Sequence, residues 1–166
     1  MKLVKPTIKF KESYCAYIKE LGSEERYPYP LDLPYQDFDA LIHTLDAYSK
    51  GLALPSWLVP NTTFWLVDNK EILGCSHLRH YLNEDLAHVG GHIGLGIRPK
   101  ARGKGLSKFL LNATIEEAVK IGIQHVHIHC YDNNIPSKKM IESTGAQLGS
   151  SVMLESENKR VLRYIY

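Results

Sequence analysis

The stretch that decides the fold is Ile97–Ala113, IRPKARGKGLSKFLLNA. It follows a segment with the character of a strand, GGHIGLGI (90–97), and it runs directly into a helix. Four basic residues and two glycines lie between the two elements. A simple turn needs no such concentration of charge and glycine, so the segment predicts an anion site at the helix N-terminus.

The physical basis of this prediction is the first turn of the helix. Its backbone N–H groups have no partner within the helix, and the helix dipole is positive at that end. Gly103 and Gly105 lack the Cβ atoms that would hold a ligand away from those groups. The arrangement suits a pyrophosphate, although spacing alone equally allows a solvated basic loop, and neither a Walker A nor a GxGxxG motif is present. Mobile positive charge around the site would come from Arg98, Lys100, Arg102 and Lys104.

Apolar periodicity predicts the elements on both sides of this stretch. The strand segments precede and follow the helix in an order that indicates an α+β fold, an α/β sandwich with a mixed, mostly antiparallel sheet and helices on both faces. Predicted helices cover 11–21, 37–50, 105–121 and 137–143, and predicted strands cover 3–9, 62–68, 71–79, 88–98, 124–132, 146–156 and 159–166.

The composition is that of an ordinary globular protein, with 44% hydrophobic and 23% charged residues among 166. We therefore expect a single domain over 1–166. The formal net charge of +2 favours no nucleic-acid partner. No apolar run approaches the ~20 residues of a membrane span, and the N-terminus lacks a signal-peptide core. Three widely spaced cysteines indicate reduced thiols, so we expect a cytoplasmic protein without a membrane partner.

Two segments carry a resemblance to a known family. RGKGLS (102–107), after GIRPKA, resembles the acetyl-CoA motif [RQ]xxGx[GA] of the GNAT N-acetyltransferases. YDNNIPSKKMIESTGAQ (131–147) resembles the second GNAT segment, in which Asn and Ser precede a short helix that ends in Gly. The resemblance covers about 64–166 and is nearest to a bacterial branch of predicted acetyltransferases.

The resemblance implies a GNAT fold with splayed central strands, and acetyl-CoA as co-substrate without a metal. It further implies transfer of the acetyl group to a primary amine of a small molecule, by direct attack in a ternary complex. Main-chain contacts to pantetheine would come from Ile97 and Arg98, on the glycine-rich strand. The distal cofactor would meet Asn134 and Ser137. The pyrophosphate would be wrapped by Arg102, Gly103, Lys104, Gly105, Leu106 and Ser107.

Two positions depart from the family pattern. Ser107 stands where the family prefers Gly or Ala, and its small hydroxyl can still bind phosphate. Many GNAT enzymes have a Tyr four residues before the glycine of the second segment, where it protonates the leaving thiolate. Ile141 occupies that position before Gly145, so the resemblance leaves the general acid unassigned.

Acetyl transfer to an amine also needs a group that accepts a proton near neutral pH. Many GNAT enzymes use a Glu on the splayed strand, and alignment on RGKG places His92 there. His92 is therefore the leading candidate base, and the alternative is a structural histidine bonded across the splayed strands. Weaker candidates around the preceding loop are His77, His80, Glu84, Asp85 and His88. The aromatic residues of the loops 23–36 and 51–60 would either line the acceptor pocket or pack in the core.

Two other classes of function compete with this reading. His125, His127 and His129 share one face of a predicted strand, a pattern that also occurs in zinc-dependent hydrolases. Neighbouring positions on that face lie ~7 Å apart, so the three side chains cannot all reach one ion. The other class is an acetyl-CoA-binding domain without catalysis, which the missing tyrosine keeps open. The sequence leaves the oligomeric state open as well, with a homodimer as one option.

Overall fold

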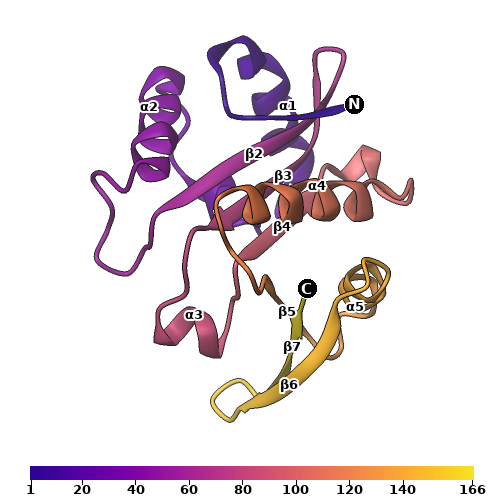
Figure 1. Cartoon of the computed structure of the whole chain (residues 1–166). Coiled ribbons are helices and arrows are strands. Elements are labelled where there is room, and N and C mark those ends of the chain that lie inside the picture. The colour runs from indigo at the N-terminus through magenta and orange to yellow at the C-terminus, as the bar shows by residue number, and fades with distance from the viewer.

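The structure is a computed structural model that describes all 166 residues (Figure 1). The helices are α1 (Lys11–Leu21), α2 (Phe38–Ser49), α3 (Glu84–His88), α4 (Leu106–Lys120) and α5 (Ile135–Glu142), with 3-10 turns η1 (Ile8–Phe10), η2 (Tyr29–Asp32) and η3 (Pro99–Ala101). The strands are β1 (Lys2–Val4), β2 (Asn61–Asp68), β3 (Glu71–Arg79), β4 (Ile93–Ile97), β5 (His127–Tyr131), β6 (Gln147–Leu154) and β7 (Lys159–Ile165).

The strands form two antiparallel sheets, ordered β1-β2-β3-β4 and β5-β7-β6. In Figure 1 the second sheet and α5 lie below the first sheet, which α4 crosses. In the first sheet Thr63 pairs with His77, and His77 pairs with Gly94, so these three positions form one row across β2, β3 and β4. This mixed α/β architecture confirms the predicted fold class.

The backbones of the two sheets pair at one point only. An isolated bridge joins Gly91 to Ile128, and the backbone N–H of His92 donates to the carbonyl of His127 at 2.7 Å. Beyond this point β4 and β5 do not pair, because β4 continues against β3 and β5 continues against β7. The divergence of the two strands opens a cleft between the sheets.

Two apolar cores pack against the sheets. Side chains of α1, α2 and η2 pack on the first sheet around Trp65, whose indole is fully buried against Phe10, Tyr14 and Phe38. A second core joins α4 and α5 to both sheets through residues such as Leu111. An aromatic side chain buries 150–250 Å² and contributes about 4–6 kcal/mol by area, so Trp65 anchors α1 and α2 on the sheet.

Several predicted strands are shorter in the structure than the sequence indicated, and two of them have a clear backbone reason. The strand predicted over 3–9 ends at Val4, because Pro6 cannot donate to a ladder, and the chain turns into η1. The strand predicted over 88–98 begins only at Ile93, since Gly90 and Gly91 have φ of +120° and +66°, which an extended strand does not adopt. His88, where the predicted strand begins, is instead the last residue of α3. None of the helices combines the length and the apolar character needed to cross a membrane.

Candidate active site

The cleft between β4 and β5 is a large concave site, with a volume of about 1380 Å³. Drug-sized ligands occupy pockets of ~300–1,000 Å³, so this cleft is large enough for a long cofactor together with an acceptor. Its walls come from α1 and the following loop, β4, the start of α4, β5 and α5. Of the predicted cofactor-binding residues, the cleft is lined by Ile97, Arg102, Gly103, Gly105, Leu106, Ser107, Asn134 and Ser137.

The glycine loop presents a row of unpartnered backbone donors to the cleft. Gly103 and Gly105 adopt φ of +74° and +73°, and a Cβ at either position would meet no atom within 4 Å. The first backbone donation in this region is from Phe109 N–H to the carbonyl of Gly105, at 3.5 Å. The N–H groups of residues 103–108 therefore have no partner in the protein. Six such groups at the positive end of a fifteen-residue helix form an anion-binding cradle.

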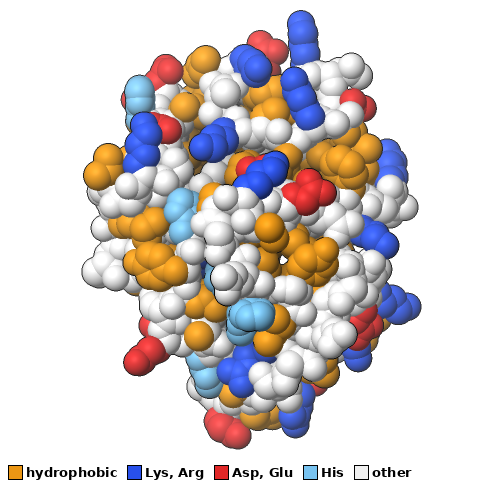
Figure 2. All heavy atoms as spheres, viewed as in Figure 1, with side chains coloured by type: hydrophobic (Ala, Val, Ile, Leu, Met, Phe, Trp, Pro, Cys, Tyr) orange, Lys and Arg blue, Asp and Glu red, His pale blue; other side chains and the backbone are white.

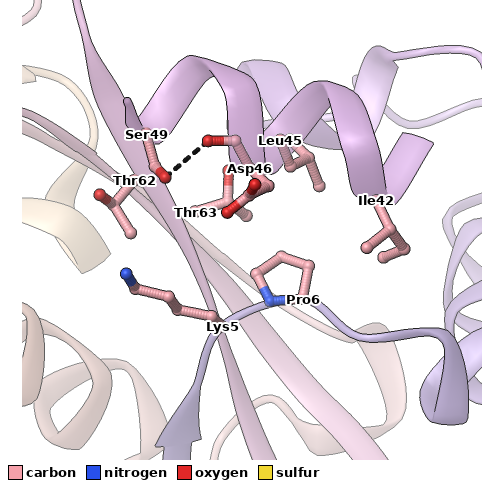
Figure 3. A pocket seen from close by; sticks show the side chains of 8 residues that line it. All are labelled: Lys5, Pro6, Ile42, Leu45, Asp46, Ser49, Thr62 and Thr63. Carbon is pink, nitrogen blue, oxygen red and sulfur yellow. Dashed lines mark hydrogen bonds between the residues drawn. The ribbon is translucent and has the colours of Figure 1, made fainter. Parts of the chain in front are cut away.

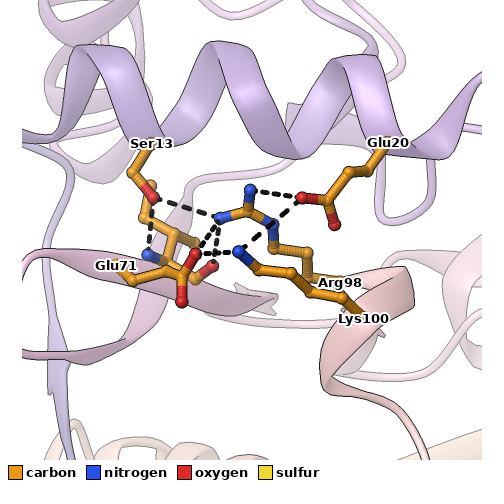
Figure 4. A network of polar contacts seen from close by, with 6 residues as sticks. Ser13, Glu20, Glu71, Arg98 and Lys100 are labelled. Carbon is orange, nitrogen blue, oxygen red and sulfur yellow. Dashed lines mark hydrogen bonds and ion pairs between the residues drawn. The ribbon is translucent and has the colours of Figure 1, made fainter.

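The basic side chains of this stretch carry far less free charge than the sequence indicated. Arg98 is only 2% exposed, and its guanidinium binds Glu20 at 2.5 Å and Glu71 at 3.0 Å (Figure 4). Lys100 also pairs with Glu71, and Ser13 joins the same network through Arg98. These contacts tie η3 to α1 and to the start of β3. Arg98 thus serves as a structural tie, and its side chain points away from the cleft.

Arg102 remains in the cleft but is already paired. Its Nε donates to the carbonyl of Ile97 at 3.0 Å, and its two Nη atoms donate to the carboxylate of Glu24 at 3.2 and 2.6 Å. Hydrogen bonding to Arg102 holds the pKa of the Glu24 carboxyl below its ordinary value. Exposed pairs of this kind contribute little stability, so a phosphate can take the place of Glu24. Lys104 alone among the four basic residues makes no ion pair.

The opposite wall of the cleft is built at the start of α5. Asn134 caps this helix, because its Oδ1 accepts from the N–H of Ser137 at 3.2 Å. Both residues lie in the cleft wall beside Tyr131 and Met140. Ile141, one residue further, is 1% exposed and packs in the second core.

The glycines of β4 accommodate the loop between α1 and α2. A Cβ at Gly94 would lie 2.6 Å from the hydroxyl of Tyr27, and a Cβ at Gly96 would overlap the carbonyl of the same tyrosine. The hydroxyl of Tyr27 thus packs against β4, while the residue as a whole is 46% exposed and lines the cleft. Strand glycines predict a close approach by a backbone or a ligand, and here the backbone of Tyr27 makes it at Gly96 and the side chain of Tyr27 makes it at Gly94.

Comparison with known proteins now identifies the fold. The sequence model of the acetyltransferase (GNAT) family matches residues 18–146, well over half of the chain. The chain belongs to the GNAT acetyltransferase family. None of the functionally curated proteins matches it in sequence.

Solved GNAT structures share the fold at low identity. A ribosomal-protein-S5-alanine acetyltransferase from Vibrio fischeri aligns with a TM-score of 0.71 at 14% identity, covering 99% of this chain and 91% of that one. A spermidine N-acetyltransferase chimera of Vibrio cholerae and hSSAT sequences gives 0.66 at 17% identity, covering 99% and 95%. A putative acetyltransferase from Salmonella typhimurium, solved with its cofactor acetyl-CoA, gives 0.66 at 13% identity, covering 99% and 92%.

Within the GNAT fold, His92 lies at the point where the strands diverge. It is 6% exposed, and its Nδ1 accepts from the backbone N–H of His127 at 2.9 Å. Burial, with help from His127 and Arg79, lowers the pKa of His92 to about 4. The neutral ring therefore carries its proton on Nε2 and has its lone pair occupied. This contact across the strands is the structural role that the sequence left as the alternative for His92.

His129 lies in the cleft wall and differs from His92 in its bonding. Neither of its ring nitrogens has a hydrogen-bond partner, and burial, with His127 and neighbouring arginines, lowers the pKa of His129 to about 4. Sequence reasoning grouped this residue with His125 and His127 as a rival zinc site. No three His, Cys, Asp or Glu side chains lie where they could hold one metal ion.

The remaining candidates are spread over other parts of the fold. His77 is buried beneath η2, near Tyr29, and His80 bonds Thr62 at 2.8 Å. Glu84, Asp85 and His88 belong to α3. A small pocket between α2 and β2, near Lys5 and Thr63, has a volume of only about 30 Å³, enough for about one water molecule (Figure 3).

Proposed function

We propose that the protein is an N-acetyltransferase that moves an acetyl group from acetyl-CoA to a primary amine by direct attack in a ternary complex. The observation that carries this proposal is the row of six unpartnered N–H groups at the start of α4. They open into a cleft whose far end lies where β4 and β5 diverge. Tyr27 packs onto β4 and narrows that end, which favours a small molecule as acceptor.

The cofactor would lie along the cleft with its pyrophosphate in the glycine loop. The N–H groups from Gly103 to Ser107 would bind the phosphate oxygens, and Lys104 and Arg102 would add charge. Pantetheine would run beside Ile97, facing Asn134 and Ser137 across the cleft. We leave Arg98 out of this set, because its N–H donates to the carbonyl of Leu73 at 2.9 Å and its carbonyl accepts from Ala101 at 2.8 Å.

The chemistry would begin with a neutral amine whose nitrogen attacks the thioester carbonyl carbon. A C–N bond forms, the C–S bond breaks, and the electron pair of that bond leaves on sulfur. The amine loses one proton to a base, and the thiolate takes one proton up. We assign the base to His129 instead of His92, because the lone pair of His129 is not engaged by the backbone.

A second function is favoured by one observation. The family's tyrosine position is Ile141, and that side chain is buried in the core, away from any thiolate in the cleft. A domain that binds acetyl-CoA without catalysis therefore stays as the alternative.

The test is to mix the protein with acetyl-CoA and a panel of amines and to follow free thiol, with calorimetry of acetyl-CoA binding in parallel. We expect binding and thiol release with at least one amine. The His129→Gln variant should lower kcat by ~10²-fold or more with unchanged cofactor affinity. Binding without thiol release for every amine would favour the binding domain, and absence of binding would refute both functions.

A further inference from the structure

The cleft contains one basic side chain without an acidic partner. Three basic residues line it, and two of these are paired, Arg102 with Glu24 at 2.6 Å and Lys159 with Glu157 at 3.0 Å. Arg79 makes no ion pair. Its only side-chain hydrogen bonds are from Nη1 to the carbonyls of Gly90 and Gly91, at 3.3 and 2.9 Å. No carboxylate reaches the guanidinium of Arg79, and the neutral hydroxyl of Tyr27 is the one side chain that lies within hydrogen-bonding reach of it.

The groups nearest to Arg79 in charge and bonding are the Tyr27 hydroxyl and three histidines, and Glu25 acts on Tyr27 from the same cleft without an ion pair to Arg79. Its guanidinium is one of the charges that lower the pKa of His77, His92 and His129, after the larger effect of burial. Burial also lowers the pKa of Arg79 itself. On the face shown in Figure 2, histidine and basic side chains lie together where the two sheets approach each other in Figure 1. A partly buried cation without an anionic partner is unfavourable unless a bound anion neutralises it.

The position of Arg79 is the acyl end of the cleft. In the register of β3 and β4, Gly74 lies opposite Ile97, next to the glycine loop, whereas the N–H of Arg79 donates to the carbonyl of His92. Five residues of β3 separate these levels, about 17 Å along the strand. Arg79 is therefore remote from the phosphate cradle. It lies instead beside the point where the strands diverge, near the hydroxyl of Tyr27.

We propose that Arg79 binds the carboxylate of the acceptor, so that the substrate is a primary amine that also carries a carboxylate, as an amino acid does. This inference rests on the acetyltransferase function proposed above. The carboxylate would accept from Nε and Nη2 in the paired geometry that guanidinium groups favour. The amine of the same molecule is then held at the acyl end of the cleft, where it attacks the thioester carbon.

The electrostatics of the site favour this class over a polyamine. Three glutamates line the cleft, but Glu24 and Glu157 are already paired and Glu25 makes no ion pair with Arg79. A polycation would be repelled by Arg79 at this end of the cleft, whereas a carboxylate neutralises it. The same carboxylate would raise the pKa of His129, because part of the depression of that pKa comes from positive neighbours. A higher pKa makes His129 a better proton acceptor at neutral pH. The carboxylate of the acceptor would thus neutralise Arg79 and also raise the pKa of the base His129.

The experiment compares matched acceptors that differ only in the carboxylate. Amino acids are paired with their amides and with their decarboxylated amines, spermidine represents the polyamines, and kcat/KM is measured by thiol release with product mass spectrometry. We expect the wild-type protein to prefer carboxylate-bearing amines by tenfold to a hundredfold, as one charged hydrogen-bonded pair provides. A wild-type preference for the amides or for spermidine would overturn the proposal without recourse to any variant.

Variants of Arg79 test whether this residue is the source of the preference for carboxylate-bearing amines. Arg79→Gln should remove it while acetyl-CoA affinity stays unchanged, and Arg79→Lys should keep part of it. Arg163→Gln is the matched control, because Arg163 also acts on the pKa of His129 but lies outside the cleft lining. It should keep the preference. An equal loss of kcat for all acceptors in Arg79→Gln would place Arg79 on the thioester oxygen and refute its acceptor role. A wild-type protein that binds no acetyl-CoA would instead refute the acetyltransferase function itself.

Discussion

Replacing Gly105 by glutamate is expected to abolish acetyl-CoA binding while the protein stays folded. Gly105 has φ of +73°, and a Cβ there would meet open space. The cost to folding is therefore the left-handed conformation alone, about 1–2 kcal/mol. Domains of this size are stable by roughly 5–15 kcal/mol, so the variant should remain native.

The cost to binding is much larger than the cost to folding. The new carboxylate would lie at the cradle formed by the N–H groups of residues 103–108. At ~5 Å from a phosphate charge, with an effective dielectric constant of ~20, the repulsion is about 3 kcal/mol for each charge. Each such increment weakens binding by more than about a hundredfold.

The assay is isothermal titration calorimetry with acetyl-CoA, supported by circular dichroism to verify folding. Gly105→Gln separates bulk from charge and should bind more tightly than Gly105→Glu. Gly122→Glu is the matched control, because Gly122 also has a positive φ and open space but lies at the other end of α4. If Gly105→Glu binds acetyl-CoA within about threefold of wild type, the phosphate cradle has been misplaced.

Three further changes test the framework of the site. Arg98→Ala should lower the free energy of unfolding by about 2–3 kcal/mol in urea titrations, because it removes the charged hydrogen bonds of a buried guanidinium to Glu20 and Glu71, which keep only Lys100 as a partner. Lys120→Ala, which breaks an exposed pair, should leave the free energy of unfolding nearly unchanged. Gly96→Val should displace the loop around Tyr27, seen as faster amide exchange in residues 22–37, and an unchanged exchange pattern would contradict the contact. His92 has a pKa of about 4 in the folded protein against 6.5 when unfolded, so the unfolded state binds more protons between these pH values. The free energy of unfolding should therefore fall by about 3 kcal/mol as the pH drops from 6.5 to 4. His92→Asn should make this pH dependence less steep, and an equally steep dependence in the variant would assign the effect to other groups.

The sequence by itself was enough for the fold class and for placing the RGKG loop at the start of a helix. Helix and strand periodicity is local, and the glycines of RGKG permit the positive φ that they adopt here without steric cost. The departure at Ile141 was likewise visible in the sequence alone. The short strand β4 was overestimated, because the period-2 pattern continues through Gly90 and Gly91 although their φ values exclude a strand.

The tertiary structure decided which side chains are available. Arg98 and His92 have the residue types of a cofactor contact and a base, yet partners far along the chain, Glu20 and His127, occupy them. Arg79 carried no sequence signal at all. Its distinction is that no acidic side chain reaches it, and that depends on how the whole chain packs. A motif reports local backbone geometry, whereas the charge and the free lone pairs of a site depend on every neighbour that folding brings to it.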